Sequence, residues 1–386
     1  MPGLSARVNS LKASSTVAFA ARAKELARQG VDVISMTAGE PDFLPPEHVL
    51  EAAREGIRLG LTKYTATEGT AELREAVAAK FKRENGLTYA PDQVLVSNGG
   101  KQTLYNAFMS VIEPGDEVVI VAPFWVSYPA QVELAGGVPV VVTARAEDGF
   151  VPDLDAVRAA ITPRTKVLLI NSPSNPTGAV FPPELVRGYA ELAEEHDLWL
   201  FSDDLYEHLV YDGEFSTAAT YVPHRTLIVH GASKGYALTG WRIGFGAGPK
   251  PLIAAMNRLQ GQTTSGANSL AQYATVAALN EVEKTAAFQA MTRAAYRERR
   301  DVLVSGLNRL GLSTPLPAGA FYVMADTTSI DPDEERAAIK LLDEARVAVV
   351  PGTDFLAPGK VRMSYATSLD QIREALQRIE ALLVLG

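Results

Sequence analysis

Short runs of β-branched and aromatic residues alternate with longer helix-like segments through the middle of this chain. The runs occupy residues 94–96, 118–121, 138–142, 167–170, 199–201 and 227–229. The segments between them, such as residues 103–112 and 183–196, place apolar side chains at helical spacing. Strands that alternate with crossover helices form parallel sheets with helices on both faces. The pattern therefore predicts an α/β fold built on a mostly parallel, helix-covered sheet.

The chain is too long for a single hydrophobic core. It has 386 residues, whereas single cores stop growing at roughly 250 to 300 residues, so we expect two domains. After residue 280 the alternation gives way to a charged helical pattern at 293–310, strand-like runs at 320–325 and 345–350, and a final helix from Asp370. We predict a large domain over residues 46–280, a smaller α+β domain over 281–386, and an N-terminal arm over 1–45 that contributes part of the small domain.

Composition disfavours several classes of function. The chain has no cysteine, which rules out disulfides and thiolate chemistry, and its 5 histidines lack metal-ligand spacing, so we predict no metal. A formal net charge of -9 disfavours a nucleic-acid partner. The apolar runs are far shorter than the roughly 20 residues of a membrane-spanning helix, and no export signal is visible. We expect no membrane association and a cytoplasmic protein.

Polar residues gather where four of the predicted strands end. They are NGGKQ at 98–102, NSPSNPTG at 171–178, SDDLY at 202–206, and GASK at 231–234, which is followed by TGWR at 239–242. In open α/β sheets, ligands bind beyond the carboxyl ends of the strands. Asp203 ends an apolar strand, where burial of an unpaired charge is costly, so it needs a cationic partner. A pyridinium nitrogen is such a partner, and with the amine of Lys234 it suggests pyridoxal phosphate.

Two glycine-rich segments have different interpretations. Gly99 and Gly100 precede a predicted helix, whose amides and dipole favour a phosphate, although an ordinary strand-to-helix turn is the commoner explanation of such a pair. The run GFGAG at 244–248 matches a dinucleotide fingerprint only in part, because its third glycine is misplaced and we expect no helix start after it. We therefore reject a dinucleotide-binding fold.

Taken together, the motifs resemble those of the class I aminotransferases, in the fold-type I superfamily of pyridoxal-phosphate enzymes. The shared segments follow the family's order: AGEPDF at 38–43, KY at 63–64, NPTG at 175–178, SD at 202–203, SK at 233–234, GWR at 240–242 and VRMS at 361–364. GGKQ at 99–102, PFWVSY at 123–128 and PGTDF at 351–355 are similar to the bacterial aspartate aminotransferase branch. The resemblance implies a large domain with a mostly parallel seven-stranded sheet and a smaller α+β domain.

The resemblance also implies how pyridoxal 5'-phosphate is held. Lys234 forms the Schiff base and moves the substrate's α-proton, and Asp203 pairs with the ring nitrogen. The other expected contacts are Tyr206 to the phenolic oxygen, Trp125 and Asn175 to the ring, and Ser233, Arg242 and the amides of Gly100 and Lys101 to the phosphate. Tyr64 is expected to reach that phosphate from a second copy of the chain, which makes the protein a homodimer with a shared active site.

The same resemblance implies an amino-acid substrate. Its α-carboxylate is expected to bind Arg362, helped by Asn175, Trp125 and the Gly39 backbone, with a cis Asn175-Pro176 bond. No motif reveals an arginine for a distal carboxylate, so Lys101 and Lys12 are our candidates. The expected reaction moves the amino group of L-aspartate to a 2-oxo acid, 2-oxoglutarate, in two half-reactions, and prephenate is a further candidate acceptor.

Two alternatives remain. Other enzymes that use pyridoxal phosphate share this scaffold, including aromatic and alanine aminotransferases and C–S lyases, and a fold does not fix a reaction. A pyridoxal-binding regulator without catalytic activity is disfavoured, because the chain is acidic and shows no helix-turn-helix module.

Overall fold

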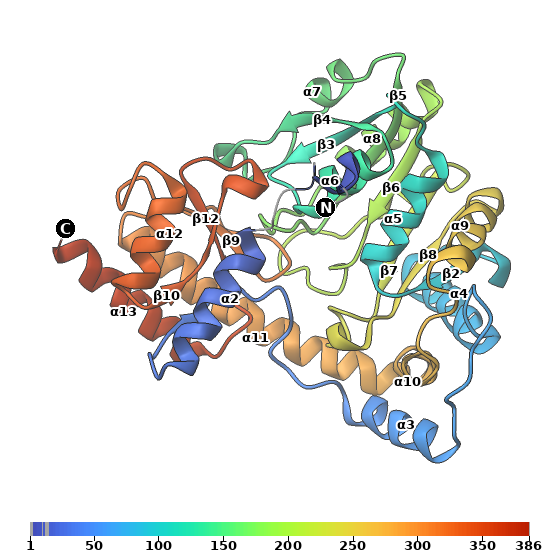
Figure 1. Cartoon of the computed structure of the whole chain (residues 1–386), viewed down its shortest axis with the longest axis horizontal. Coiled ribbons are helices and arrows are strands. Elements are labelled where there is room, and N and C mark those ends of the chain that lie inside the picture. Colours follow the sequence, from blue (N-terminus) through green and yellow to red (C-terminus); the bar gives the residue numbers. More distant parts are fainter. Residues whose placement is uncertain (1–2, 10, 12–14, 386) are drawn as a thin grey trace.

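A seven-stranded sheet forms the centre of the larger part of the molecule in the computed structural model, which describes residues 3–9, 11 and 15–385 (Figure 1). The strands are β2 (Val94–Ser97), β3 (Glu117–Ala122), β4 (Val138–Thr143), β5 (Thr165–Asn171), β6 (Trp199–Asp203), β7 (Thr226–Gly231) and β8 (Gly244–Ala247). They lie in the order β2-β8-β7-β6-β5-β3-β4. β8 runs antiparallel to both of its neighbours and the other adjacent pairs are parallel. The predicted mostly parallel sheet is confirmed.

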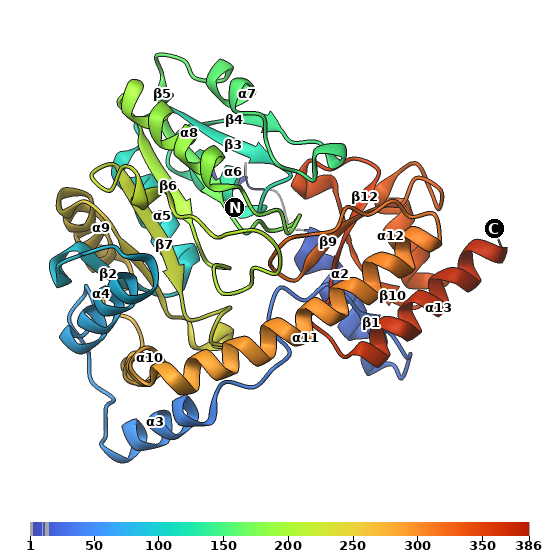
Figure 2. The same ribbon diagram turned by 180° about the vertical axis from the view of Figure 1, so that it is seen from behind.

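Helices cover both faces of this sheet. In β2, Leu95 faces the side covered by α5 (Gly100–Val111), α6 (Ser127–Leu134) and α9 (Lys250–Thr263). Val94 and Val96 face the opposite side, because successive strand residues point to opposite faces. The helices on that side are α4 (Ala71–Asn85), α7 (Leu154–Ala159), α8 (Pro183–Glu195) and α10 (Ser269–Asn280), and α8 is seen best from behind (Figure 2). The inner strands are thus buried on both sides, as their continuous apolar runs require, whereas the edge strand β4 leaves Val138 and Val141 exposed.

Strand β8 is an element of the large sheet that the sequence pattern does not predict. Glycine is unfavourable in a strand, but β8 passes so close to α5 that larger residues do not fit. A Cβ at Gly244 would lie 2.2 Å from the carbonyl carbon of Gly99 and 2.3 Å from the nitrogen of Gly100. Helix α9 begins at Lys250, shortly after this segment. The expectation that no helix start follows the GFGAG run was therefore wrong, although the run itself forms a strand and not a phosphate-binding turn.

The C-terminal part of the chain forms the smaller α+β region. Its antiparallel sheet has the order β11-β12-β9. Helix α11 joins this region to α10 and begins at Val282, well before the predicted start at residue 293. The run predicted at 345–350 forms two short strands in place of one. The elements are α11 (Val282–Arg309), β9 (Tyr322–Asp326), α12 (Glu334–Asp343), β10 (Val347–Ala348), β11 (Val350–Pro351), β12 (Lys360–Ser364) and α13 (Leu369–Leu385).

The N-terminal segment joins this smaller region in space. β1 (Ile34–Ser35) pairs in parallel with β10, and α2 (Ser15–Arg28) contacts β10 and β11. α1 (Ala6–Asn9) precedes them, and α3 (Glu47–Arg58) packs on α10. The domain boundaries at residues 45 and 280 stay a prediction. In the described part of the chain, no helix is both long and apolar enough to cross a membrane.

Candidate active site

A cavity of about 290 Å³ opens beyond the carboxyl ends of the parallel strands. Most of its walls follow β2, β5, β6 and β7, and the smaller region adds side chains from β9 and β12. The parallel arrangement brings these loops together, because the carboxyl ends of parallel strands meet at one edge of the sheet. The predicted site residues in its lining are Gly39, Gly100, Lys101, Trp125, Asn175, Asp203, Tyr206, Ser233, Lys234, Arg242 and Arg362.

The N-terminus of α5 forms one end of the cavity. Gly99 precedes the helix with a φ of 83°, and no side chain in the described part of the chain caps the first amides. The guanidinium of Arg242 lies against this turn, so that a Cβ at Gly99 would lie 2.5 Å from Arg242 Nη2. Arg242 itself has a left-handed backbone, with a φ of 57°. A positive side chain beside uncapped helix amides makes this end suitable for a phosphate.

Lys234 points into the cavity from the loop after β7. Its Nζ donates a hydrogen bond to the Gly39 carbonyl and lies 5.7 Å from the centroid of the Tyr206 ring. Burial lowers the pKa of Lys234 to about 8, while Glu40 acts in the opposite direction and Arg362 adds to the lowering. A neutral amine is therefore accessible near neutral pH, as a nucleophile or general base requires.

Asp203 is a buried carboxylate at the end of β6, with 4% of its surface exposed. The Tyr128 hydroxyl donates a hydrogen bond of 2.6 Å to Asp203 Oδ2. Burial raises the pKa of Asp203 to about 6, against the effect of this bond and of the Leu205 amide. Among the described residues, no arginine or lysine forms an ion pair with Asp203. The carboxylate therefore suits a cationic group of a ligand.

Arg362 is a buried cation on β12 without a carboxylate partner in the described part of the chain. Its Nη1 donates to Asn175 Oδ1 and its Nη2 to the Thr37 carbonyl, each at 3.0 Å. Its Nε is buried and makes no hydrogen bond to any residue that the structure describes. Burial lowers the pKa of Arg362. A planar cation with a free donor suits a carboxylate from a ligand. The Asn175-Pro176 bond is cis, as expected.

Two further side chains complete the walls. The Lys101 Nζ lies 5.0 Å from the centroid of the Trp125 ring, and burial, with Arg242, lowers the pKa of Lys101. The Tyr206 hydroxyl lies 2.9 Å from the Tyr322 hydroxyl. Burial, together with Tyr322, raises the pKa of Tyr206 well above its ordinary value, so its hydroxyl stays protonated and able to donate.

Two predicted residues are not brought to this cavity within one chain. Tyr64 is 99% exposed and lies outside the cavity lining. Lys12 lies outside the described residues.

Four lining residues have no role in the sequence-based prediction: Tyr128, Asn171, Leu205 and Tyr322. Asn171 could have been found, because it directly follows the apolar run at 167–170 and its Nδ2 donates to the Asp203 carbonyl. Tyr128 and Tyr322 look like core aromatics in the sequence. Only the fold reveals that their hydroxyl groups meet Asp203 and Tyr206.

Comparison with known proteins identifies the family. The family described as "Aminotransferase class I and II" matches residues 31–379. The chain belongs to this family. It is 55% identical over 383 residues to the "Aspartate/prephenate aminotransferase" of Thermus thermophilus, covering 99% of each chain. It is 47% identical over 397 residues to the protein of the same description from Cereibacter sphaeroides, covering 99% of this chain and 98% of the relative.

A solved structure agrees with this assignment. The "aspartate aminotransferase from Thermus thermophilus with maleate" has a TM-score of 0.97 and 55% sequence identity, and the match covers 99% of this chain and 100% of that chain. The predicted resemblance to class I aminotransferases and the fold type are confirmed. This aminotransferase depends on pyridoxal phosphate, as predicted.

The cavity of this aminotransferase fits that cofactor part by part. The uncapped α5 terminus and Arg242 face the end where a phosphate fits. Asp203 offers an anion for the ring nitrogen, and Lys234 offers an amine for the aldehyde. The Arg362 Nε donor is left for the substrate. The helix amides, Asp203, Lys234 and Arg362 thus each have a counterpart in the cofactor or in an amino acid.

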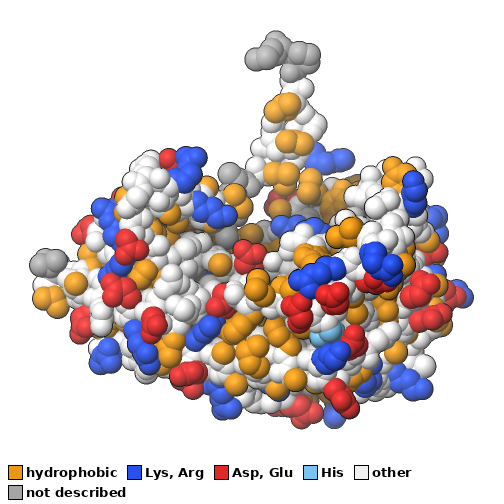
Figure 3. Space-filling view, turned by 90° about the horizontal axis from the view of Figure 1, so that it is seen from below, with side chains coloured by type: hydrophobic (Ala, Val, Ile, Leu, Met, Phe, Trp, Pro, Cys, Tyr) orange, Lys and Arg blue, Asp and Glu red, His pale blue; other side chains and the backbone are white. Residues whose placement is uncertain are grey.

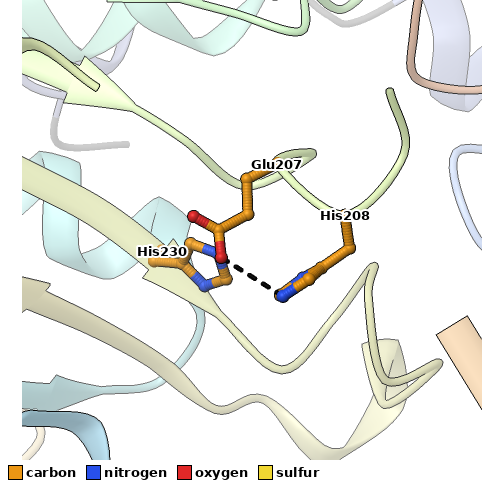
Figure 4. A group of neighbouring side chains, drawn as sticks. All are labelled: Glu207, His208 and His230. Carbon is orange, nitrogen blue, oxygen red and sulfur yellow. Dashed lines mark ion pairs between the residues drawn. The ribbon is translucent and has the colours of Figure 1, made fainter. Parts of the chain in front are cut away.

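A second, largely buried polar cluster of this aminotransferase contains Glu207 and His208, which directly follow Tyr206 in the chain, and His230 of β7 (Figure 4). We call Lys80, Glu207, His208 and His230 the Glu207 cluster. The ligand atoms of Glu207, His208 and His230 lie within 4.8 Å of one another, a proximity that their sequence spacing does not reveal. In Figure 4 both histidine rings point toward the Glu207 carboxylate.

The hydrogen bonds of the Glu207 cluster disfavour a metal ion. The Gly231 N–H donates to His230 Nδ1 at 2.7 Å. The proton of the neutral ring is therefore on Nε2, which faces Glu207 Oε1 at 3.3 Å and has no lone pair for a metal. Burial lowers the pKa of His230 to about 4, so the ring is neutral at neutral pH. The ammonium of Lys80, whose side chain is fully buried, already bonds to Glu207. We interpret the cluster as an internal ion pair.

Proposed function

We propose that this chain is a cytoplasmic aminotransferase that moves the amino group of L-aspartate to 2-oxoglutarate in two half-reactions. One observation carries the proposal: Arg362 is a buried cation that lines the same cavity as the Lys234 amine. An α-carboxylate on Arg362 brings the amino group of an amino acid toward the centre of that cavity. The names of the relatives, which include aspartate, support the choice of substrate.

We assign the steps to the side chains as follows. Bound pyridoxal phosphate supplies an aldehyde that condenses with amines and a ring that accepts an electron pair. Arg362 orients the substrate through its carboxylate. Lys234 Nζ takes the α-proton, because burial lowers the pKa of Lys234 to about 8 and part of the amine is neutral at pH 7. Asp203 keeps a negative charge beside the ring nitrogen, and Tyr206 donates a hydrogen bond to the cofactor.

We assign the distal carboxylate of aspartate to Lys101. Its Nζ lies over the Trp125 ring inside the cavity and has no carboxylate partner among the described residues. Lys12 remains the second candidate from the sequence. We also propose prephenate as an amino acceptor, which the names of the Thermus and Cereibacter relatives support.

The first experiment separates an aminotransferase from a lyase. The cofactor-loaded protein is mixed with L-aspartate in the absence of any 2-oxo acid, and oxaloacetate is measured. We expect one equivalent of oxaloacetate per chain and then no more, and 2-oxoglutarate should restart the reaction and yield glutamate. Continuous product release without an acceptor indicates a lyase, and a complete absence of oxaloacetate refutes aspartate as the donor. Lys234→Ala should give no oxaloacetate at all.

The second experiment tests recognition of the distal carboxylate. We expect Lys101→Met to lower kcat/KM for L-aspartate but not for L-alanine, which has no distal carboxylate. Lys250→Met is the control, because Lys250 is an exposed lysine paired with Asp92. With prephenate as acceptor, we expect amino transfer that is lost in Lys12→Met. Equal effects of Lys101→Met on both amino acids contradict the role of Lys101, and no transfer to prephenate contradicts that acceptor.

We further propose a homodimer in which Tyr64 completes the phosphate site of the partner. Tyr64 is fully exposed in the single chain, and tyrosine is enriched at interfaces because it joins a large apolar ring to a polar hydroxyl. The N-terminal segment stands away from the body of the molecule and exposes Leu4 and Val8 (Figure 3). Both features favour burial against a second copy.

Subunit mixing tests this arrangement. Lys234→Ala and Tyr64→Ala chains are purified, mixed under mild denaturation and refolded. A mixed dimer then contains one site with an intact Lys234 and the intact Tyr64 of the partner, so activity should rise above that of either parent. If Tyr64 serves its own chain, mixing produces no such gain. Light scattering gives the oligomeric state directly.

A further inference from the structure

Tyr128 donates the only side-chain hydrogen bond that Asp203 receives from the described residues. It is the second residue of α6, its side chain is buried, and its hydroxyl reaches Asp203 Oδ2 at 2.6 Å. The Leu205 amide approaches the other oxygen, Oδ1, at 3.4 Å, which is the limit of a hydrogen bond. The orientation of the Asp203 carboxylate in the cavity therefore depends mainly on Tyr128.

Tyr128 also fixes the aromatic wall of the cavity. Its ring meets the Trp125 ring edge to face, with centroids 5.3 Å apart and an interplanar angle of 85°. The Tyr128 amide donates to the Trp125 carbonyl at 3.0 Å. One side chain thus contacts both the carboxylate expected at the ring nitrogen and the indole expected at the ring face.

Apart from Tyr128, few groups stabilise the negative charge of Asp203. The titratable groups that act on it are Tyr128 on α6, Lys234 after β7, and Asp204 and Tyr206 after β6. Burial is the largest influence and raises the pKa of Asp203, and the hydrogen bond from Tyr128 is the largest influence in the opposite direction. Lys234 contributes less, and in the proposed function its amine is engaged in the reaction.

We propose that Tyr128 is a positioning residue, whose hydroxyl orients the Asp203 carboxylate and stabilises its negative charge for the ring nitrogen of the cofactor. This inference rests on the proposed function and adds a residue to it. A merely structural tyrosine in the core would contribute to packing, and Phe would replace it without effect on the charge of Asp203.

The variant Tyr128→Phe tests the inference, with cofactor affinity as the main readout. The dissociation constant of pyridoxal phosphate is measured by equilibrium dialysis between pH 5 and pH 9. We expect about tenfold weaker binding at pH 7, the effect of one lost hydrogen bond to a charged group. The acidic limb of the binding curve should move to higher pH, because Asp203 then needs a higher pH to ionise. In turnover, kcat should fall while KM for aspartate stays within about twofold, since Arg362 is unchanged.

Tyr189→Phe is the matched control. Tyr189 lies in α8, is fully buried, and its hydroxyl has no hydrogen-bond partner within residues 3–9, 11 and 15–385. This variant should leave cofactor binding and kcat unchanged. Tyr128→His keeps a ring and a donor, so it should regain part of the lost affinity. Equal affinity and pH dependence in Tyr128→Phe and wild type overturn the inference, as does an equal loss in Tyr189→Phe. The dialysis measurement needs no aspartate, so its outcome is separate from that of the proposed reaction.

Discussion

The active-site cavity and the Glu207 cluster share β6, β7 and the loops that follow these strands, but they differ in how their buried charges are paired. β6 ends at Asp203, which lines the cavity, and the loop after it supplies Glu207 to the cluster; β7 supplies His230 to the cluster, and the loop after it supplies Lys234 to the cavity. In the Glu207 cluster the carboxylate is satisfied by Lys80 from within the chain. In the cavity, the described residues leave Asp203 without a cation and Arg362 without an anion.

The pairing of a buried charge distinguishes a structural role from a functional one in this fold. A buried charge without a partner costs several kcal/mol, which selection tolerates only where a ligand supplies the partner. Burial alone would raise the pKa of Glu207, but Lys80 and the two histidines hold that pKa well below its ordinary value. Burial raises the pKa of Asp203 to about 6. The Glu207 carboxylate is stabilised by the protein itself, and the Asp203 carboxylate is available for the cofactor.

Removal of Lys80 should have the largest effect on stability. Lys80→Met leaves Glu207 buried without its cation, and breaking a buried pair in this way costs about 3–5 kcal/mol. The free energy of unfolding is measured by urea denaturation. The loss should be present above about pH 4.3, the unfolded pKa of a glutamate, and should shrink as pH falls and the carboxyl becomes protonated. Lys250→Met, at an exposed ion pair, should cost less than about 1 kcal/mol. A loss as small as that control contradicts the structural role of the cluster.

Replacement of Arg362 should have a large effect on turnover but not on folding. Arg362→Gln removes a cation that has no anionic partner among the described residues, so the free energy of unfolding should not fall. A desolvated charge pair with a ligand is worth about 2–5 kcal/mol. We therefore expect kcat/KM for aspartate to drop by about 30-fold to 4,000-fold. Arg373→Gln, at an exposed arginine, is the control for charge. Unchanged kcat/KM in Arg362→Gln would show that the carboxylate binds elsewhere.

The active-site cavity and the Glu207 cluster also differ in how far the sequence alone predicts them. Asp203 and Lys234 were found because each follows a strand within a few residues, and the carboxyl ends of parallel strands converge. The Glu207 cluster joins α4, the loop after β6, and β7, so no local pattern marks it. Lys80 looks like an ordinary surface lysine of a helix, and His230 like a residue of an apolar strand. Strand β8 was missed for a similar reason, because its Gly244 is required by the close backbone of Gly99 and Gly100, which lie far away in the sequence. The roles of Tyr64 and Lys12 stay predictions.

Removal of the Lys234 amine should stabilise the cofactor-free protein. Burial lowers the pKa of Lys234 to about 8, whereas an unfolded lysine has a pKa of about 10.4. Below pH 8 the folded protein carries the full cost of the buried charge. Between pH 8 and pH 10.4 the unfolded chain binds more protons than the folded one, so the wild type gains stability as pH rises. Lys234→Met should thus be more stable by about 1–3 kcal/mol at pH 7.

The pH dependence distinguishes this effect from a general gain in packing. The advantage of Lys234→Met should decline above pH 8 and vanish near pH 10.4, as measured by urea denaturation of the cofactor-free proteins. Lys284→Met, at an exposed lysine, should show no such trend. A constant advantage at every pH would mean that the charge of Lys234 is not the cause.

The smallest expected change comes from the removal of both charges of the internal pair. Lys80→Met with Glu207→Gln leaves no buried charge at that position, and neutral replacements of buried pairs are often close to neutral in stability. The glutamine can still bond to the Asn85 amide, which lies 3.2 Å from Glu207 Oε2. We expect the free energy of unfolding of the double variant to lie within about 1 kcal/mol of the wild-type value. This change is much smaller than the sum of the losses in the two single variants. Its kcat should stay close to that of the wild type, because the cluster supports the loops without touching the substrate.

Additive losses of stability in the double variant would mean that Lys80 and Glu207 act separately. A large fall in kcat at unchanged stability would mean that the cluster also positions Tyr206.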